Sequence, residues 1–287
     1  MNTQFHELPD GTRLAYEEHG SGQPVLLLHG VLASRRFFER NIAALSQRYH
    51  VYALDFRGHG DSADSQGGNT VEQYARDLHH FLTAHELTGV VAVGWSMGNL
   101  VIWEYLAQFP ASPRIDAQVC ISQGPSDLRT AEWDYGFTDS AGLRDLVKAS
   151  QENYRELCGS VAAILTKVLP SAADLEWMIA EQCKTLPNTA ACVLADQTQR
   201  DYRPVIPELE LPILAVWGTD EKCLPVAAGQ WLARTAPHAE LVVFEDSGHM
   251  PMWEEADRFN TLVAQWIDAQ VDRIPRRLGD HQNLWSA

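Results

Sequence analysis

The stretch Gly94-Trp95-Ser96-Met97-Gly98 decides the fold of this chain. It follows the apolar run at 90–93 and precedes residues 99–106, in which apolar side chains recur at helical spacing. A G-x-S-x-G sequence at the turn from a strand to a helix is the pattern of a nucleophile elbow. So tight a turn needs small neighbours, and it holds the serine in a strained backbone conformation with its hydroxyl exposed. A glycine-rich turn with a bystander serine is the alternative, and the flanking elements argue against it.

Short apolar strands alternate with helices around this turn. We expect strands at 12–19, 25–28, 51–54, 90–93 and 117–122, and helices at 37–47 and 70–87. Strands without polar alternation are typical of a parallel sheet that helices bury on both faces. The alternation resumes with strands at 212–217 and 241–244, and a helix at 262–270 closes it. The expected fold class is therefore α/β, with a mostly parallel sheet flanked by helices.

The middle of the chain breaks this alternation. Residues 126–205 contain helical stretches and no convincing strand. A helical insertion before the last two strands would form a cap over the carboxyl ends of the strands, where open α/β sheets bind ligands. A helical layer on the flank of the sheet is the alternative. We therefore expect a core at 1–125 and 206–271, a helical cap at 126–205 and a C-terminal tail at 272–287, in which Leu284 and Trp285 could dock.

Composition narrows the partners of this 287-residue chain. Its formal net charge of -16 argues against nucleic acid and anionic membranes, because both need basic patches. Residues 1–9 lack the basic and apolar regions of a signal peptide, and no apolar run could span a bilayer. Five cysteines without a CxxC pair indicate reduced thiols, with Cys120 in the core, and a cytoplasmic protein. A small-molecule partner is expected; the oligomeric state stays open, with a homodimer as one option.

A serine nucleophile needs a base within hydrogen-bond reach and an acid that orients the base. The chain offers candidates in the order serine, acid, histidine, which this architecture expects. His249 follows the last expected strand in a loop that Gly248 opens, and it is the candidate base. Two adjacent carboxylates, Asp220 and Glu221, follow the strand at 212–217. Either could reach the second imidazole nitrogen of His249.

The developing oxyanion needs two backbone N–H donors, each worth ~3 kcal/mol of barrier. Met97, directly after the serine, is one candidate. Val31, in the loop after His29-Gly30, is the other, and we expect His29 itself to shape that loop. This chemistry requires no metal and no organic cofactor.

Together these segments resemble the α/β-hydrolase superfamily over residues 12–270. The matching pieces are Leu28-His29-Gly30, the segment 55–62, the elbow, Trp217-Gly218 with its carboxylates, and Ser247-Gly248-His249. The resemblance implies a mostly parallel α/β-hydrolase sheet carrying a helical cap. Residues 248–255 look like the arylesterase and non-haem haloperoxidase-like branch, and some N-acyl-homoserine lactonases share the Gly-Trp-Ser start of the elbow.

The family's acid motif is G-x-x-D with a proline four residues later. Anchored on Gly218 and Pro225, this register favours Glu221 as the acid and keeps Asp220 as the alternative. Asn99 stands where the family usually has another glycine, so it could pack with a slight shift or line the floor of the site. We take Trp95 and Asn99 as candidate substrate-binding residues.

The resemblance implies a serine hydrolase that cleaves carboxylic esters or lactones of a fairly apolar small molecule through an acyl-enzyme. Several aromatic side chains of 126–205, if they face the site, would favour aromatic or medium-chain substrates. They are Trp133, Tyr135, Phe137, Tyr154 and Trp177, with Met178 beside them. Hydrolysis of a C–C bond in a β-diketone-type compound and perhydrolysis are alternatives with the same triad. A non-catalytic ligand receptor on this fold is a further alternative.

Overall fold

The computed structural model describes residues 3–62, 67–111 and 113–271, and its described strands form one eight-stranded sheet. The strand order is β1-β2-β4-β3-β5-β6-β7-β8, and β2 runs antiparallel to both neighbours while the other pairs are parallel. The strands are β1 Gln4–Glu7, β2 Arg13–Gly20, β3 Pro24–Leu28, β4 His50–Leu54, β5 Val90–Trp95, β6 Ile115–Ile121, β7 Ile213–Gly218 and β8 Ala239–Phe244. Every residue of β5 and β7 is buried, as apolar strands covered on both faces require.

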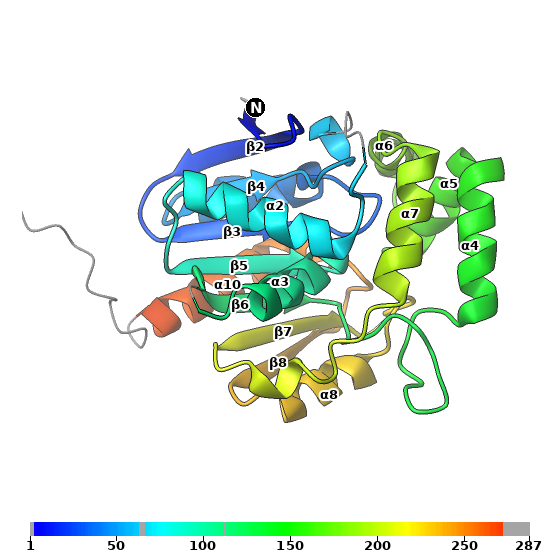
Figure 1. Ribbon diagram of the computed structural model, residues 1–287. Coiled ribbons are helices and arrows are strands. Elements are labelled where there is room, and N and C mark those ends of the chain that lie inside the picture. Colours follow the sequence, from blue (N-terminus) through cyan, green and yellow to red (C-terminus); the bar gives the residue numbers. More distant parts are fainter. Residues whose placement is uncertain (1–2, 63–66, 112, 272–287) are drawn as a thin grey trace, which may run out of the picture.

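Helices cover both faces of this sheet (Figure 1). Helices α2 (Val71–Ala84), α3 (Met97–Gln108) and α8 (Val226–Thr235) bury their apolar sides in the core of one face. Helices α1 (Glu39–Leu45) and α10 (Ala256–Val271) do the same in the core of the other. The predicted fold class, a mostly parallel α/β sheet flanked by helices, is confirmed. Shorter helices are α9 at Pro251–Glu254 and three 3-10 turns at Arg35–Phe38, Gly60–Ser62 and Ile206–Glu208.

Four more helices lie between β6 and β7 in the chain: α4 (Ser140–Glu152), α5 (Tyr154–Ile164), α6 (Ala172–Gln182) and α7 (Pro187–Thr198). They stand together beyond one end of the strands (Figure 1). Helix α6 is tied to the segment after β3, since its buried Glu181 accepts from the Ser34 hydroxyl at 2.8 Å and from the Arg36 guanidinium at 2.5 Å. The division into a core and a helical cap remains a prediction, and the expected tail at 272–287 lies outside the described residues.

Strand β1, helix α8 and the short helix α9 are among the elements not expected from the sequence. Strand β1 is four residues long and alternates half-buried with exposed side chains, so it has no apolar run to mark it. Helix α8 follows the loop after β7 and packs on β7 and β8. None of the described helices is long and apolar enough to cross a membrane. All five cysteines are free, and Cys120 is fully buried in β6, as expected.

The sheet topology indicates where on the sheet a ligand would bind. Strand β3 lies beside β5, and the connections after these two strands diverge: the one after β3 runs through α1 on one face to β4, and the one after β5 runs through α3 on the other face to β6. In open α/β sheets the loops at such a switch point leave a crevice at the carboxyl ends of the strands. The loop at Gly30 follows β3 and Ser96 follows β5, which brings these two segments together at the crevice.

Candidate active site

Ser96 occupies the turn between β5 and α3 in a conformation that few L-residues adopt. Its φ is 50° and its ψ is -124°, and its N–H donates to the carbonyl of Ile121 at 3.0 Å. A residue held in so sparsely populated a region costs ~1–3 kcal/mol. Only a fixed surrounding structure maintains such strain, and it aims the side chain out of the turn.

Close packing around the turn explains its glycines. A Cβ atom on Gly98 would lie 2.3 Å from the carbonyl oxygen of Leu28, so any side chain there would push α3 away from β3. At Gly94 a Cβ would lie 2.5 Å from Oδ1 of Asn99. Both positions therefore exclude larger residues for steric reasons, and the family's third small residue is replaced here by an asparagine.

Asn99 lies beneath the elbow and is fully buried. Its Nδ2 donates to the carbonyl of Gly94 at 2.9 Å, and its Oδ1 accepts from Nε2 of Gln118 at 3.0 Å. The Gln118 side chain in turn accepts from the indole of Trp103 at 3.1 Å. Asn99 is not among the residues that line the cavity described below, so the structure gives it a supporting position in place of the expected contact with substrate.

His249 and Glu221 face each other across two loops of the sheet. Nδ1 of His249 lies 2.8 Å from Oε2 of Glu221, and their side chains are 4% and 1% exposed. The other carboxylate oxygen accepts from the backbone N–H groups of Cys223 at 2.8 Å and Leu224 at 3.3 Å. The indole of Trp95 donates to the His249 carbonyl at 2.9 Å and steadies this loop. Since Nδ1 is engaged, Nε2 is the nitrogen left for a reacting group.

Asp220 points elsewhere. Its side chain is 51% exposed, and it pairs with the ammonium of Lys167 at 3.1 Å. The structure therefore brings Glu221, and not Asp220, to the imidazole. This matches the register that the spacing from Gly218 to Pro225 favours.

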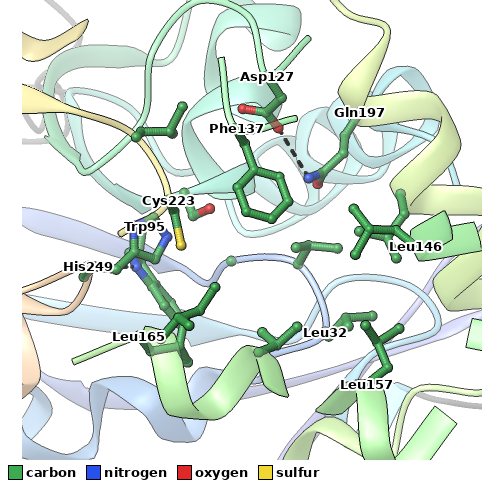
Figure 2. Close-up of a pocket in the computed structure, with 17 residues that line it drawn as sticks. Leu32, Trp95, Asp127, Phe137, Leu146, Leu157, Leu165, Gln197, Cys223 and His249 are labelled. Atoms are coloured by element: carbon green, nitrogen blue, oxygen red, sulfur yellow. Dashed lines mark hydrogen bonds between the residues drawn. The ribbon is translucent and has the colours of Figure 1, made fainter. Parts of the chain in front are cut away.

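Ser96 and His249 line one cavity of about 60 Å³ together with Gly30, Val31 and Trp95 (Figure 2). The opposite wall is aliphatic and comes from α4, α5 and α7. Its residues include Leu146, Leu157, Val161, Ile164 and Leu194. Of the six large side chains at 133–178 that the sequence suggested, Phe137 alone lines this cavity; the site is more aliphatic than aromatic.

The loop after β3 is shaped by His29, as expected. The imidazole is fully buried, its Nδ1 donates to the carbonyl of Gly30 at 2.7 Å, and its Nε2 accepts from the N–H of Phe56 at 3.1 Å. Burial holds its pKa well below the usual range, so it stays neutral. Val31 follows directly and lines the cavity, and Met97 is the first residue of α3, where backbone N–H groups lack intrahelical partners.

Glu221, Cys223 and His249 offer ligand atoms within 4.8 Å of one another. Hydrogen bonds already account for two of these groups, since Nδ1 of His249 is bonded to one Glu221 oxygen and the other oxygen accepts from two backbone N–H groups.

Two residues of the site, Gln118 and Asp127, were not predicted from the sequence. Gln118 lies in β6, where an apolar strand gives no signal for a buried amide. Asp127 is 3% exposed, lines the cavity and accepts from Nε2 of Gln197 at 3.2 Å (Figure 2). Its signal was its position a few residues after a strand of the parallel sheet, at the carboxyl edge.

Comparison with known proteins identifies the family. The family model described as the alpha/beta hydrolase family matches residues 25–262. The chain belongs to the alpha/beta hydrolase family. The resemblance seen in its sequence is thereby confirmed.

Relatives of this alpha/beta hydrolase carry several names. It is 27% identical over 252 residues to a pimeloyl-acyl-carrier-protein methyl ester esterase of Nitrosomonas europaea, covering 85% of this chain and 95% of that protein. An esterase of Exiguobacterium antarcticum superposes with a TM-score of 0.88 at 22% identity, over 93% of this chain and 100% of that one. A bromoperoxidase of Bacillus anthracis does so with a TM-score of 0.88 at 21% identity and the same coverage. The two structural likenesses establish the fold.

Proposed function

We propose that this alpha/beta hydrolase is a serine hydrolase of carboxylic esters or lactones. The observation that carries the proposal is the buried pair of His249 and Glu221, whose Nδ1 and Oε2 are 2.8 Å apart, with His249 lining the same cavity as the strained Ser96. The relative from Nitrosomonas europaea, named as a methyl ester esterase, supports the same reaction class.

The proposed reaction has two halves. Ser96 Oγ attacks the carbonyl carbon while Nε2 of His249 takes its proton, and the Val31 and Met97 N–H groups hold the oxyanion. Glu221 fixes the imidazole by its hydrogen bond to Nδ1 and stabilises the imidazolium. His249 then protonates the leaving alcohol, and a water that it activates hydrolyses the acyl-enzyme. Asp220, exposed and paired with Lys167, has no part in these steps.

The cavity points to a compact, apolar acyl group. Its volume is about 60 Å³ and most of its lining side chains are aliphatic. Burying an apolar chain there is favourable by ~0.8 kcal/mol per methylene until the space is filled. We therefore expect short-chain esters and small lactones to be better substrates than long-chain esters.

A fluorophosphonate probe and a panel of p-nitrophenyl esters and acyl-lactones test the proposal. Wild type should label and turn over short esters, and Ser96→Ala should lose both. The exposed serine at the start of α4 supplies a control, Ser140→Ala, which should behave as wild type. Labelling without ester or lactone turnover would favour the C–C hydrolase or perhydrolase alternatives, which β-diketone and peroxide assays then separate. Absence of labelling would favour a ligand receptor.

A further inference from the structure

The cavity wall holds a buried carboxylate of its own, distinct from Glu221, which lies behind His249. Asp127 lies in the loop after β6, and its two oxygens each accept one hydrogen bond from a glutamine amide. Nε2 of Gln123 donates to Oδ1 at 2.7 Å, and Nε2 of Gln197 donates to Oδ2 at 3.2 Å (Figure 2 shows the second bond). Within the described ranges, no lysine or arginine forms an ion pair with this carboxylate.

The carboxylate fixes the orientation of both amides. Only the NH₂ end of a glutamine can donate to it, so each amide oxygen must point away. Gln123 and Gln197 are 1% and 5% exposed, and Oε1 of each is buried without a hydrogen-bond partner. Each carboxylate oxygen of Asp127 therefore accepts one hydrogen bond and could accept another. The amide oxygens of Gln123 and Gln197 accept none. A buried acceptor left unpaired costs ~1–3 kcal/mol.

Among the described residues, the side-chain hydrogen bonds to this carboxylate come from the two glutamines alone. The cavity side chains near the helices are otherwise apolar, among them Phe137, Leu146 and Leu194. Burial raises the pKa of Asp127 to about 6, and the Gln123 hydrogen bond opposes this shift. In its ionised form Asp127 brings into the cavity a negative charge with which no lysine or arginine of the described residues forms an ion pair.

We propose that Asp127 and Gln197 form a subsite that binds a hydrogen-bond donor of the substrate, supplied by an ammonium or a hydroxyl group. The proposal rests on the proposed function, since it places this donor group in the same cavity as the carbonyl that Ser96 attacks. An ammonium brings a positive charge and three donors, whereas a hydroxyl brings one donor. A substrate carboxylate would be repelled. Charge-assisted hydrogen bonds are about twice as strong as neutral ones.

Ligand binding to the Ser96→Ala protein tests the subsite without any need for catalysis. Calorimetric titrations at pH 8 would use three probes of nearly equal size: n-butylammonium, n-butanol and n-butyrate. We expect n-butylammonium, n-butanol or both to bind about tenfold or more tightly than n-butyrate. The ranking of the first two identifies the donor as cationic or neutral.

Asp127→Asn, added to Ser96→Ala, keeps the shape and removes the charge, and it should abolish the preference. Asp145→Asn is the matched control, because it makes the same change of charge at an exposed position on α4 beside Leu146. Should Asp127→Asn fail to fold, Gln197→Met removes the second member of the pair at similar volume and should weaken donor binding several-fold.

The two proposals fail separately. Equal binding of all three probes, or a preference that survives Asp127→Asn, would overturn the subsite even if wild type hydrolyses esters. Selective, Asp127-dependent binding in a protein that turns over no ester or lactone would support the subsite and overturn the esterase. A preference that Asp145→Asn removes equally would show that overall charge, and not this pair, attracts the probe.

Discussion

The two walls of the cavity are built on different principles. The sheet wall consists of loops after strands, and hydrogen bonds fix each functional group: His249 by Glu221 and Trp95, and His29 by Gly30 and Phe56. The helix wall consists mainly of aliphatic side chains from α4, α5 and α7 that pack without directed bonds, and Gln197 of α7 is its polar exception. A wall made of directed bonds tolerates few residue types, whereas a wall made of packing tolerates many of suitable size. Changes to the sheet wall should therefore affect the rate of the chemical step or the stability of the fold, and changes to the helix wall should affect which substrate fits.

The largest effect is expected from Glu221→Gln. An amide cannot stabilise the imidazolium, and it can hold His249 in the wrong tautomer, a defect that costs ~10⁴-fold in kcat in a comparable triad. We expect kcat for p-nitrophenyl butyrate to fall ~10³- to 10⁴-fold with little change in KM. Asp220→Asn, the neighbouring carboxylate in the chain, is the control and should change kcat less than threefold. A collapse at Asp220 with normal activity in Glu221→Gln would remove the hydrogen-bonded pair from the mechanism.

Loss of the Gln118 side chain, which supports the elbow through Asn99, should lower the free energy of unfolding. Gln118→Leu would leave the Oδ1 of Asn99 and the indole N–H of Trp103 buried without partners. At ~1–3 kcal/mol for each stranded group, the free energy of unfolding should fall by about 3 kcal/mol. Urea denaturation measures it, and Gln47→Leu at an exposed position is the control, expected within ~0.5 kcal/mol of wild type. A small loss in Gln118→Leu would mean that the elbow is held by its backbone packing alone.

The buried His59 should make the stability of the fold sensitive to acid. Burial lowers the pKa of His59 to about 4, whereas an unfolded histidine has a pKa of about 6.5. Between these values the unfolded state binds more protons, so stability rises with pH across this window and is lost as pH falls. From pH 6.5 to pH 5 His59 should contribute a loss of ~2 kcal/mol.

Comparing wild type with His59→Gln isolates this contribution. Asp127 has a pKa raised by burial to about 6, so it binds its proton more readily in the folded state and acts with the opposite sign in both proteins. Urea unfolding at pH 7, 6 and 5 should show a shallower decline in His59→Gln. The exposed His238→Asn should follow wild type. Parallel curves for wild type and His59→Gln would mean that His59 becomes protonated in the folded protein.

The difference between the walls also explains what the sequence could predict. Positions 94 and 98 accept only glycine, because a Cβ atom there would lie 2.5 Å and 2.3 Å from neighbouring oxygen atoms. The strained turn at Ser96 requires both glycines, so the elbow is visible in the sequence as a short motif. Glu221 could be preferred over Asp220 because the spacing to Gly218 and Pro225 sets the register. Asp127 and Gln197 come together only after α7 folds back beside the loop after β6, so no local spacing announces them.

The sequence also does not indicate which aliphatic residues line the cavity. Leucines that face the cavity and leucines that face another helix have the same helical periodicity, because both lie on an apolar side of their helix. Phe137 lines the cavity while Trp133, in the same segment before α4, and Met178 of α6 are buried elsewhere. That distinction depends on how this segment and the helices are placed relative to the sheet. The aromatic pocket expected from the sequence is accordingly reduced to Phe137 and Trp95.

The smallest effect is expected at the helix wall, and it should be a change of preference. Leu157 of α5 is 8% exposed and lines the cavity, so Leu157→Ala would enlarge a space of about 60 Å³ next to the acyl group. Each additional buried methylene is favourable by ~0.8 kcal/mol, which is about fourfold in kcat/KM. The optimum in a series of p-nitrophenyl esters should therefore move to chains one or two methylenes longer, with kcat/KM for those esters about tenfold higher relative to butyrate. Val168→Ala, at a side chain 73% exposed, should leave the series unchanged. An unchanged optimum in Leu157→Ala would place the acyl group outside this cavity, and the two walls would then not enclose the same part of the substrate.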